Sequence, residues 1–350
     1  VLAFKLDGIL IGDLIYDSYL SYGYATMPSI DKINRYELFN VMQSIFYNRR
    51  VIKHIVKHYD IETCLVAHTV GTAGGVFSRY LVSNNIEVWE RYSTLKKHRS
   101  IKTLYYSAAR PDMKYVKFMQ NRLGYFIPLA EKHLNNRLKN RSSDWGAQLP
   151  YLRDKRVFYN RQEFSKNFGL SPSKKNIFVM LHAFNDFPNS FGFTIYRDYY
   201  EWFKTVLNIA QEVDSVNWIF KEHPGAKYYP TKDLDLELIF SKINVSNIRF
   251  LNKDANFNTS SLRYVADAIC TCIGTAGLEY SAFGVPCILS GKTWYSGFGF
   301  TVEPRTDVEF KKILKNIDKL PRLNNEQINI AKIIALFTFD IIEVTKFPDP

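Results

Sequence analysis

The chain has 350 residues, of which 46% are hydrophobic and 15% aromatic, and its formal net charge is +12. This composition is ample for a packed core and indicates two domains, without repeats or low-complexity tracts. No segment approaches the roughly 20 consecutive apolar residues that span a bilayer, which argues against a membrane-spanning protein. The positive charge leaves nucleic acid, an anionic membrane surface and phosphorylated substrates as partners to weigh.

The first half of the chain alternates strand-like and helical segments, which predicts an α/β domain. The expected elements are a strand over residues 3–10, a helix over 36–58, a strand over 63–68, a helix over 76–83 and a strand over 86–90. A glycine turn over residues 70–75 makes part of this series typical of half a nucleotide-binding fold. Because Val1 leads directly into a strand-like segment without a signal peptide, we expect an N-terminal piece to be missing.

Residues 113–159 form a basic, aromatic and helical segment. A charged face of this kind is ordinarily solvated helix surface. The functional alternative is contact with an anionic bilayer or with a phosphorylated acceptor.

The second half begins after a linker-like stretch over residues 170–176. The expected elements are strands over 177–181, 218–222, 248–251, 268–273 and 287–289, helices over 196–213 and 262–266, and two helices within 308–343. Two βα halves of similar size predict an α/β fold of two facing Rossmann-like domains, 1–170 and 171–350, with a central cleft. Ligands bind outside the carboxyl ends of such strands, so this cleft is the expected active site.

A glycine turn follows the strand expected over residues 268–273. Gly274 and Thr275 open a helix, and Gly277 keeps its first turn narrow. Such a turn aims free backbone N–H groups and the positive end of a helix at an anion. We expect Thr275 and the N–H groups of Ala276 and Gly277 to hold a phosphate.

Two further features belong with that turn. Glu279, one turn into the same helix, could accept hydrogen bonds from ribose hydroxyls, or be only a favourable charge in a first helical turn. His223 and Pro224 end another strand, beside Lys221, and a histidine there can donate to a phosphate oxygen. The alternative for His223 is an ordinary histidine in a surface turn.

Candidate catalytic groups follow the strand over residues 177–181. His182 and Asp186 place an imidazole and a carboxylate at the end of that strand, where either could serve a bound substrate as nucleophile or general base. The alternative for Asp186 is a helix N-cap or turn residue. Asp17 belongs to an acidic cluster near the start of the chain that could face the acceptor, or be part of an ordinary exposed loop.

The four cysteines all fall in segments expected to be core strands, which is typical of reduced thiols in a cytoplasmic protein. They are Cys64, Cys270, Cys272 and Cys287. Their spacing is a poor zinc signal, and no Asp-x-Asp motif is present, so we expect no metal.

The run Lys221–Pro224 and the run Gly274–Glu279, closed by Gly284–Pro286, resemble motifs of the capsule-polysaccharide-biosynthesis glycosyltransferases. These enzymes include the bacterial β-Kdo transferases of capsule and O-antigen assembly, and the motifs also look like those of bacterial sialyltransferases that use CMP-sugars. Residues 5–17 and 66–69 are similar to segments of surface-carbohydrate enzymes of the same clan, so the resemblance spans most of the chain.

The resemblance implies a GT-B fold and transfer of Kdo from CMP-β-Kdo, with retention of configuration, to a lipid-linked or oligosaccharide acceptor. By resemblance, His223 contacts the CMP phosphate, the turn at Thr275 holds it, Glu279 contacts ribose or base, and Asp186 is the catalytic carboxylate. Such an enzyme is expected in the cytoplasm, with peripheral contact at the inner membrane face. A donor with one phosphate and no diphosphate needs no metal clamp.

Two other classes stay open at this stage. One is another enzyme of the same architecture, such as a nucleotide-sugar 2-epimerase or a CDP-glycerol-type glycerophosphotransferase. The other is a nucleic-acid-binding module, which only the net charge suggests. Dispersed basic and aromatic residues and the lack of a nucleic-acid signature argue against nucleic acid as a partner.

Overall fold

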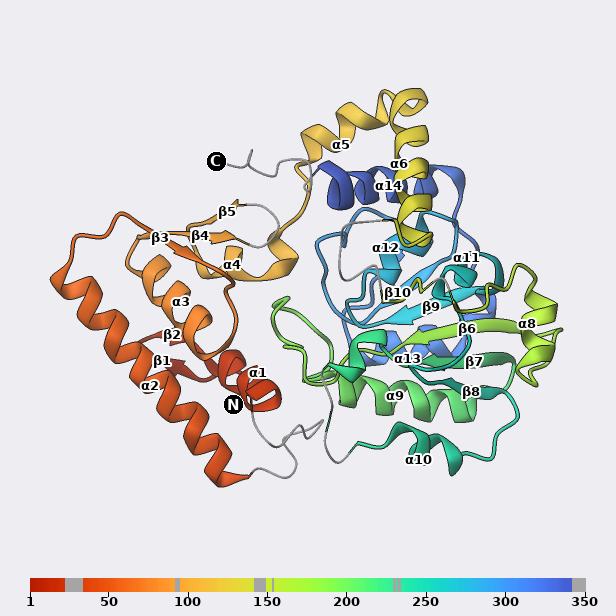
Figure 1. Cartoon of the computed structure of the whole chain (residues 1–350), viewed down its shortest axis with the longest axis horizontal. Helices are drawn as coiled ribbons and strands as arrows, with labels where there is room; N and C mark the ends of the chain where they lie inside the picture. The colour runs from red at the N-terminus through yellow and green to blue at the C-terminus, as the bar shows by residue number, and fades with distance from the viewer. Residues whose placement is uncertain are drawn as a thin grey trace.

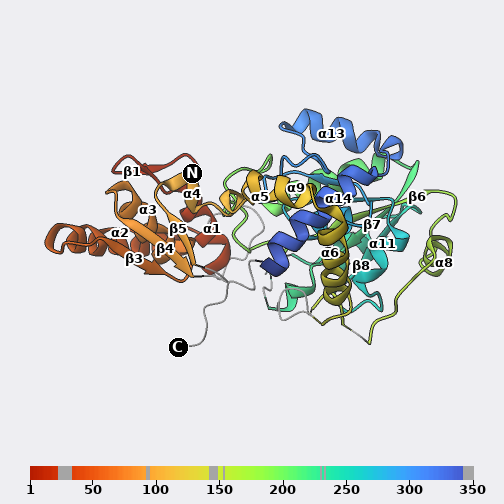
Figure 2. The same cartoon turned by 90° about the horizontal axis from the view of Figure 1, so that it is seen from above.

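The computed structural model describes residues 1–22, 34–91, 95–141, 149–152, 154–228, 231 and 234–341. It consists of an N-terminal unit, residues 1–109, and a larger C-terminal unit, residues 110–341, which lie side by side (Figures 1 and 2). The α/β class predicted from the sequence is confirmed. The two-unit, GT-B-like arrangement is present with a small N-terminal unit, while the predicted cleft between the units stays a prediction.

The N-terminal unit is built on a sheet of three strands in the order β3-β4-β5. The strands β3 and β4 are parallel, whereas β5 runs antiparallel to β4. The sequence predicted a Rossmann-like domain here, and the unit is not a complete Rossmann fold. Its elements are β1 (Lys5–Leu6), β2 (Ile9–Leu10), α1 (Gly12–Tyr22), α2 (Arg35–His58), β3 (Thr63–Val66), α3 (Val76–Ser83), β4 (Glu87–Arg91), β5 (Leu95–His98) and α4 (Ile101–Leu104).

The strand expected over residues 3–10 is instead a short antiparallel hairpin of β1 and β2. Asp7 and Gly8 connect the two strands with φ angles of 52° and 77°. Two consecutive residues with positive φ form the tight turn for which an Asp-Gly pair is favoured. The acid at this turn is held by Arg49 and Lys53 of α2, at 2.7 and 3.3 Å, and therefore does not face an acceptor.

The C-terminal unit contains a six-stranded sheet in the order β11-β10-β9-β6-β7-β8, and every neighbouring pair is parallel. Counted along the chain, this is the Rossmann order, in which the first and fourth strands are neighbours at the centre. The strands are β6 (Lys175–Met180), β7 (Val216–Lys221), β8 (Ile248–Leu251), β9 (Ala268–Thr271), β10 (Cys287–Leu289) and β11 (Thr301–Val302). The helices are α5 (Met113–Gln120), α6 (Leu123–Leu138), α8 (Arg161–Asn167), α9 (Tyr199–Glu212), α10 (Leu236–Ser241), α11 (Leu262–Val265), α12 (Ala276–Ser281), α13 (Asp307–Lys315) and α14 (Asn325–Leu336).

Both faces of this sheet are covered by helices, because successive side chains of a strand point to opposite faces. Trp218 and Phe220 of β7 are buried in a cluster with α9, α10 and α13. Ile219, between them, belongs to a second cluster with α6, α8, α11, α12 and α14. Cys270 and Cys287 are buried in these clusters and all four cysteines are free, as predicted. No helix in the described ranges is both long and apolar enough to cross a membrane.

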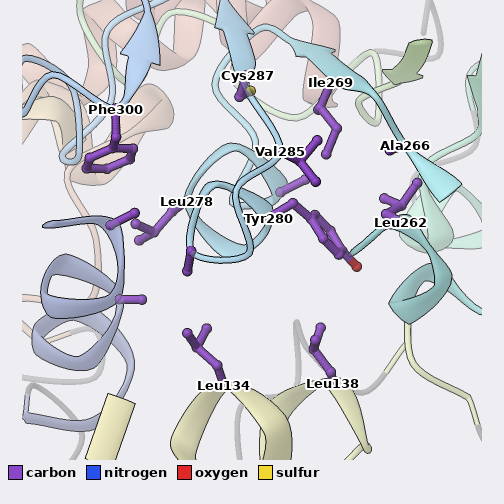
Figure 3. Packing of buried hydrophobic residues seen from close by; sticks show 14 of the residues in the cluster. Leu134, Leu138, Leu262, Ala266, Ile269, Leu278, Tyr280, Val285, Cys287 and Phe300 are labelled. Carbon is purple, nitrogen blue, oxygen red and sulfur yellow. The ribbon is translucent and has the colours of Figure 1, made fainter. Parts of the chain in front are cut away.

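The predicted domain boundary at residue 170 is wrong, because α5, α6 and α8 pack into the C-terminal unit. Leu134 and Leu138 of α6 face Leu278 and Tyr280 of α12 in the buried cluster that Figure 3 shows. The basic segment predicted to be an accessory of the first domain therefore completes the core of the second. Packing places the boundary near residue 110.

A buried ion pair joins α6 to α12. Arg137 Nε lies 2.5 Å from Glu279 Oε1, and the Tyr151 hydroxyl donates to Glu279 Oε2 at 2.8 Å. The side chains of Arg137 and Glu279 are only 3% and 5% exposed. Both oxygens of this carboxylate are therefore occupied within the core.

Replacing Glu279 by Gln should lower the free energy of unfolding by about 3–5 kcal/mol, because it leaves the Arg137 guanidinium buried without its counter-charge. Urea denaturation measures this loss. The matched control is Glu163→Gln, which removes the partner of Arg156 in an exposed pair and should cost less than about 1 kcal/mol. Equal losses in the two variants would contradict the role given to the buried pair.

Candidate active site at the strand ends

The candidate site lies where the carboxyl ends of β6 and β9 meet. These two central strands are neighbours in the sheet, and the connections that follow them pass to opposite faces. Ligands of open parallel sheets bind at such a switch point. His182, just beyond β6, and the turn at Gly274, just beyond β9, are brought together there. The sequence instead predicted that the strand ending at His223 lies beside the strand before Gly274, but β6 lies between these two strands, β7 and β9.

His182 is fixed by the turn that follows β9. Its Nε2 lies 3.2 Å from the backbone N of Cys272 and 3.1 Å from Thr271 Oγ1. Because the Cys272 N–H can only donate, Nε2 is the unprotonated nitrogen and a neutral ring carries its proton on Nδ1. The ring also stacks on Tyr199, with centroids 4.2 Å apart.

Burial, and then the nearby His223, lower the pKa of His182 to about 3, so the imidazole is neutral at neutral pH. Its Nδ1 has no hydrogen-bond partner among the residues that the structure describes. His182 was predicted as a catalytic residue. The geometry gives it a positioning role at the turn and leaves one N–H donor for a ligand.

His223, at the end of the next strand β7, has the opposite tautomer to His182. Its Nδ1 accepts from the Gly225 N–H at 3.1 Å and caps the short 3-10 turn that begins at Pro224. A neutral ring therefore keeps its proton on Nε2. Burial, and then the charge of Lys221, lower the pKa of His223 to about 4.

Lys221, the last residue of β7, is 6% exposed. Burial, and then repulsion from Lys155, lower the pKa of its ammonium to about 8. The ammonium donates to the Glu222 carbonyl at 3.4 Å, and its charge acts on His223. A buried cation near an imidazole N–H donor is a chemically suitable environment for an anion, since an anion would stabilise the charged state of the lysine.

The glycine turn offers two free amides. The N–H groups of Thr275 and Ala276 have no partner within the described part of the chain, whereas the Gly277 N–H donates to the Gly274 carbonyl at 3.1 Å. The expectation that the Gly277 N–H holds a phosphate is therefore wrong. Gly277 matters for packing instead, because an added Cβ would lie 2.5 Å from the Tyr295 hydroxyl.

Glu279 does not reach this turn's ligand side. Its carboxylate is committed to Arg137 and Tyr151 in the core, so the predicted contact with ribose is not available in this arrangement. The alternative agrees better with the structure, because Glu279 is an acidic residue in the first turn of α12. Its buried partner, Arg137, was not predicted.

Asp186 lies in the loop between β6 and α9, and its side chain is exposed. Its carboxylate has no hydrogen-bond or ion-pair partner among the described residues. Its backbone is engaged, because its N–H donates to the Ala183 carbonyl at 3.0 Å and its carbonyl accepts from the Tyr199 hydroxyl at 3.5 Å. The surrounding protein crowds this carboxyl despite its access to solvent, and such desolvation raises its pKa. Asp186 therefore presents a solvent-accessible carboxylate with no partner in the described part of the chain.

Asp17 was predicted as a catalytic residue, but its carboxylate is bound by Asn189. Its carboxylate accepts from the N–H of Asn189 at 3.0 Å and from Asn189 Nδ2 at 2.8 Å. It is 3% exposed, and burial raises its pKa well above the ordinary value. Asp17 thus fixes α1 to the loop that carries Asp186.

Other contacts strengthen this junction between the units. The Tyr16 hydroxyl donates to Asp198, which is also the N-cap of α9, and the Ser21 hydroxyl donates to the Asn185 carbonyl. Sequence reasoning missed the interface role of this loop. An acidic residue in a largely apolar segment gave no signal of a partner so far along the chain.

A cavity of about 360 Å³ opens beside His182. Its apolar wall includes Phe184 and Phe250. Its polar groups include the carboxyl residues Glu222, Asp235 and Glu237. This cavity at the ends of β6, β7 and β8 was not predicted, because its lining comes from four separate segments. In the described ranges, no cluster of three or more His, Cys, Asp and Glu side chains is placed to hold a metal ion.

No family model and no curated protein sequence matches the chain. Solved structures similar to it include the β-Kdo 2,4 transferase of Thermosulfurimonas dismutans KpsC, at 15% identity over 78% of each chain with a TM-score of 0.43. The β-Kdo 2,7 transferase of the same KpsC is 15% identical over 87% of this chain and 98% of that chain, with a TM-score of 0.38. The wall teichoic acid polymerase TagF is 16% identical over 52% of this chain and 46% of its own, with a TM-score of 0.32. At these values the likenesses assign no residue a role.

The two half-buried histidines, His182 and His223, predict a loss of stability in acid. The unfolded chain binds protons on them near pH 6.5, whereas the folded chain does so only near the pKa values of about 3 and about 4. Between these limits the unfolded state binds more protons, so the free energy of unfolding falls as the pH falls. His223→Asn removes one titrating group while its side-chain oxygen can still cap the turn at Gly225.

This variant should therefore lose less stability than the parent between about pH 7 and about pH 5, measured from urea midpoints. The matched control is the same change at exposed His58. An acid-induced loss as large in His223→Asn as in the parent would contradict the neutral, half-buried state of His223.

Proposed function

We propose that the chain is a glycosyltransferase that moves a sugar from a CMP-linked donor to a carbohydrate acceptor. The observation that carries this proposal is that several N–H and ammonium donors lie at the carboxyl ends of the neighbouring strands β9, β6 and β7. The donors are His182 Nδ1, His223 Nε2, the Lys221 ammonium and the amides of Thr275 and Ala276.

These donors suit a leaving nucleoside monophosphate. Cleavage of the bond between the sugar and CMP adds negative charge to the phosphate, and prearranged donors in a partly dry site stabilise that charge. The two imidazoles are already neutral N–H donors at neutral pH, so they need no protonation before the phosphate binds. A monophosphate also needs no metal clamp, and metal-independent transfer is part of the proposal.

The cavity beside His182 supports cytosine as the base. Its volume, about 360 Å³, falls in the range of small-molecule sites, and Phe184 and Phe250 offer faces against which a base can pack. Cytosine carries an exocyclic amine donor where uracil carries an acceptor, and carboxylates accept from that amine. Glu222, Asp235 and Glu237 therefore favour CMP over UMP.

Asp186 is the proposed nucleophile of a retaining reaction. Its carboxylate attacks the anomeric carbon, the bond from that carbon to the CMP phosphate oxygen breaks, and CMP leaves with the bonding electrons. The acceptor hydroxyl then attacks the same carbon, loses its proton, and releases the carboxylate. Retention follows because two displacements occur at one centre.

The finer assignment proposed for this enzyme is Kdo as the sugar and a lipid-linked O-antigen or capsule glycan as the acceptor. It rests on the motif resemblance at Lys221–Pro224 and Gly274–Glu279. An enzyme that uses CDP-glycerol would share the phosphate site but carry a diphosphate donor. Tighter binding of CDP-glycerol than of CMP would therefore favour that class.

Calorimetric titration in EDTA should detect CMP binding, with UMP binding more weakly. His223→Ala and His223→Asn should each weaken CMP binding by about 1–3 kcal/mol, since both remove the Nε2–H donor. Because Asn retains a cap for the Gly225 N–H, agreement between the two variants separates ligand contact from damage to the turn. Unchanged CMP affinity in His223→Asn would rule out this phosphate contact.

Asp186→Asn should remove most turnover while leaving CMP affinity and the urea midpoint unchanged, because the exchange is nearly isosteric and the carboxylate has no partner to lose. Asp214→Asn, at an exposed carboxylate before the amino end of β7, is the control and should keep full activity. Mass spectrometry of the unmutated enzyme with donor alone should find the sugar on the peptide that contains Asp186. Near-normal turnover of Asp186→Asn would refute the assignment, and an adduct on another peptide would move the nucleophile there.

A further inference from the structure

The helix α2 has an outer face that the reaction does not use. It runs along the edge of the N-terminal unit, away from the C-terminal sheet (Figure 1). With 24 residues it is about 36 Å long. Its inner stripe, which includes Val41, Ile45 and Ile52, is buried against the unit's core. A helix of this length therefore presents a continuous second stripe to solvent.

Large aromatic side chains occupy the first half of that outer stripe. We call Tyr36, Phe39, Phe46 and Tyr47 the aromatic stripe; their exposed fractions are 73%, 62%, 44% and 62%. The spacing of these positions places them on one side of the helix, opposite the buried stripe. Single exposed aromatic residues are ordinary, but a row along one helix face is typical of an interaction surface.

Cations share this face. We call Arg35, Arg50 and Lys57 the cationic group; they are exposed and have no carboxylate partner in the described part of the chain. Their neighbours Arg49 and Lys53 differ, because both are held by Asp7. The helix contains one acidic residue, Glu37, which is 8% exposed. The outer face of α2 therefore has positive charge that nothing on the helix neutralises.

Exposed aromatic rings together with exposed cations distinguish between two possible partners of this face, a second copy of the chain and an anionic bilayer. A second copy packed on the same face would bury the cationic groups of both helices with no carboxylate on either face to compensate, which is costly. An anionic bilayer supplies the missing negative charge and also accepts Tyr and Phe rings at the level of the headgroups. The charge and the aromatic content are thus satisfied together only by the lipid surface.

We propose that α2 docks this protein on an anionic membrane, with the helix axis in the plane of the interface and the aromatic stripe inserted among the headgroups. The docking surface goes beyond the proposed function, and its test needs neither donor nor acceptor. It also differs from the basic segment in which the sequence suggested membrane contact. There, Arg137 is committed to Glu279 and the helices α5 and α6 pack on α14.

The test is co-sedimentation of the full chain with vesicles of phosphatidylcholine, and with vesicles of phosphatidylcholine and phosphatidylglycerol in equal amounts. We expect binding to the anionic vesicles that weakens as salt is raised. Changing the whole aromatic stripe to Ser should weaken that binding more than about tenfold. Changing Arg50 and Lys57 to Gln should remove most of the preference for anionic vesicles.

The matched control carries Ser at Tyr115, Phe118 and Tyr125, which are exposed aromatic residues of α5 and α6 beside Lys114 and Lys117. It should bind vesicles like the parent. An equal loss in this control, equal binding to neutral and anionic vesicles, or no vesicle binding would each overturn the proposal. Self-association of the parent that the aromatic-stripe variant abolishes, without vesicle binding, would assign the face to a second copy instead.

Discussion

The hydrogen bond from the Cys272 N–H to His182 Nε2 is the contact on which the candidate site depends. It joins the end of β6 to the end of β9 at the centre of the sheet, and it determines which nitrogen of His182 carries the proton. The parallel register of β6 with β7 then brings His223 to the same edge. Removing the acceptor on His182 would leave a buried N–H unpaired and free the turn that presents Thr275 and Ala276.

The N-terminal unit bears on the site through the loop between β6 and α9. Asp17 holds Asn189 of that loop, and the Tyr16 hydroxyl holds Asp198 at its far end. The loop carries Asp186 between these anchors and the end of β6. The position of the proposed nucleophile is therefore set jointly by both units, and a change of contact at α1 would move Asp186 relative to the phosphate site. This coupling gives buried acids of α1 a positioning role without contact to substrate.

The sequence predicted the local elements of the C-terminal half well, because buried parallel strands are short apolar runs and glycine marks where a helix starts or stops. It also predicted that the strands ending at His223 and before the Gly274 turn belong to one sheet, but it made them neighbours, whereas β6 lies between them. The tautomers, the commitment of Glu279 to Arg137, and the occupation of Asp17 could not be predicted. Only the His223 tautomer depends on a near neighbour, Gly225. The others depend on partners far along the chain, as for the 142-residue separation of Arg137 and Glu279. The prediction of the domain boundary was wrong for the same reason, since the sequence of an amphipathic helix does not indicate which core the helix packs against.

The most direct test of the central claim is a structure of the protein with CMP bound. The account predicts the phosphate at the switch point, within hydrogen-bonding distance of His223 Nε2 and of the Thr275 and Ala276 amides, with the base in the cavity beside His182. CMP bound elsewhere, with the ends of β6, β7 and β9 unchanged and unoccupied, would contradict it.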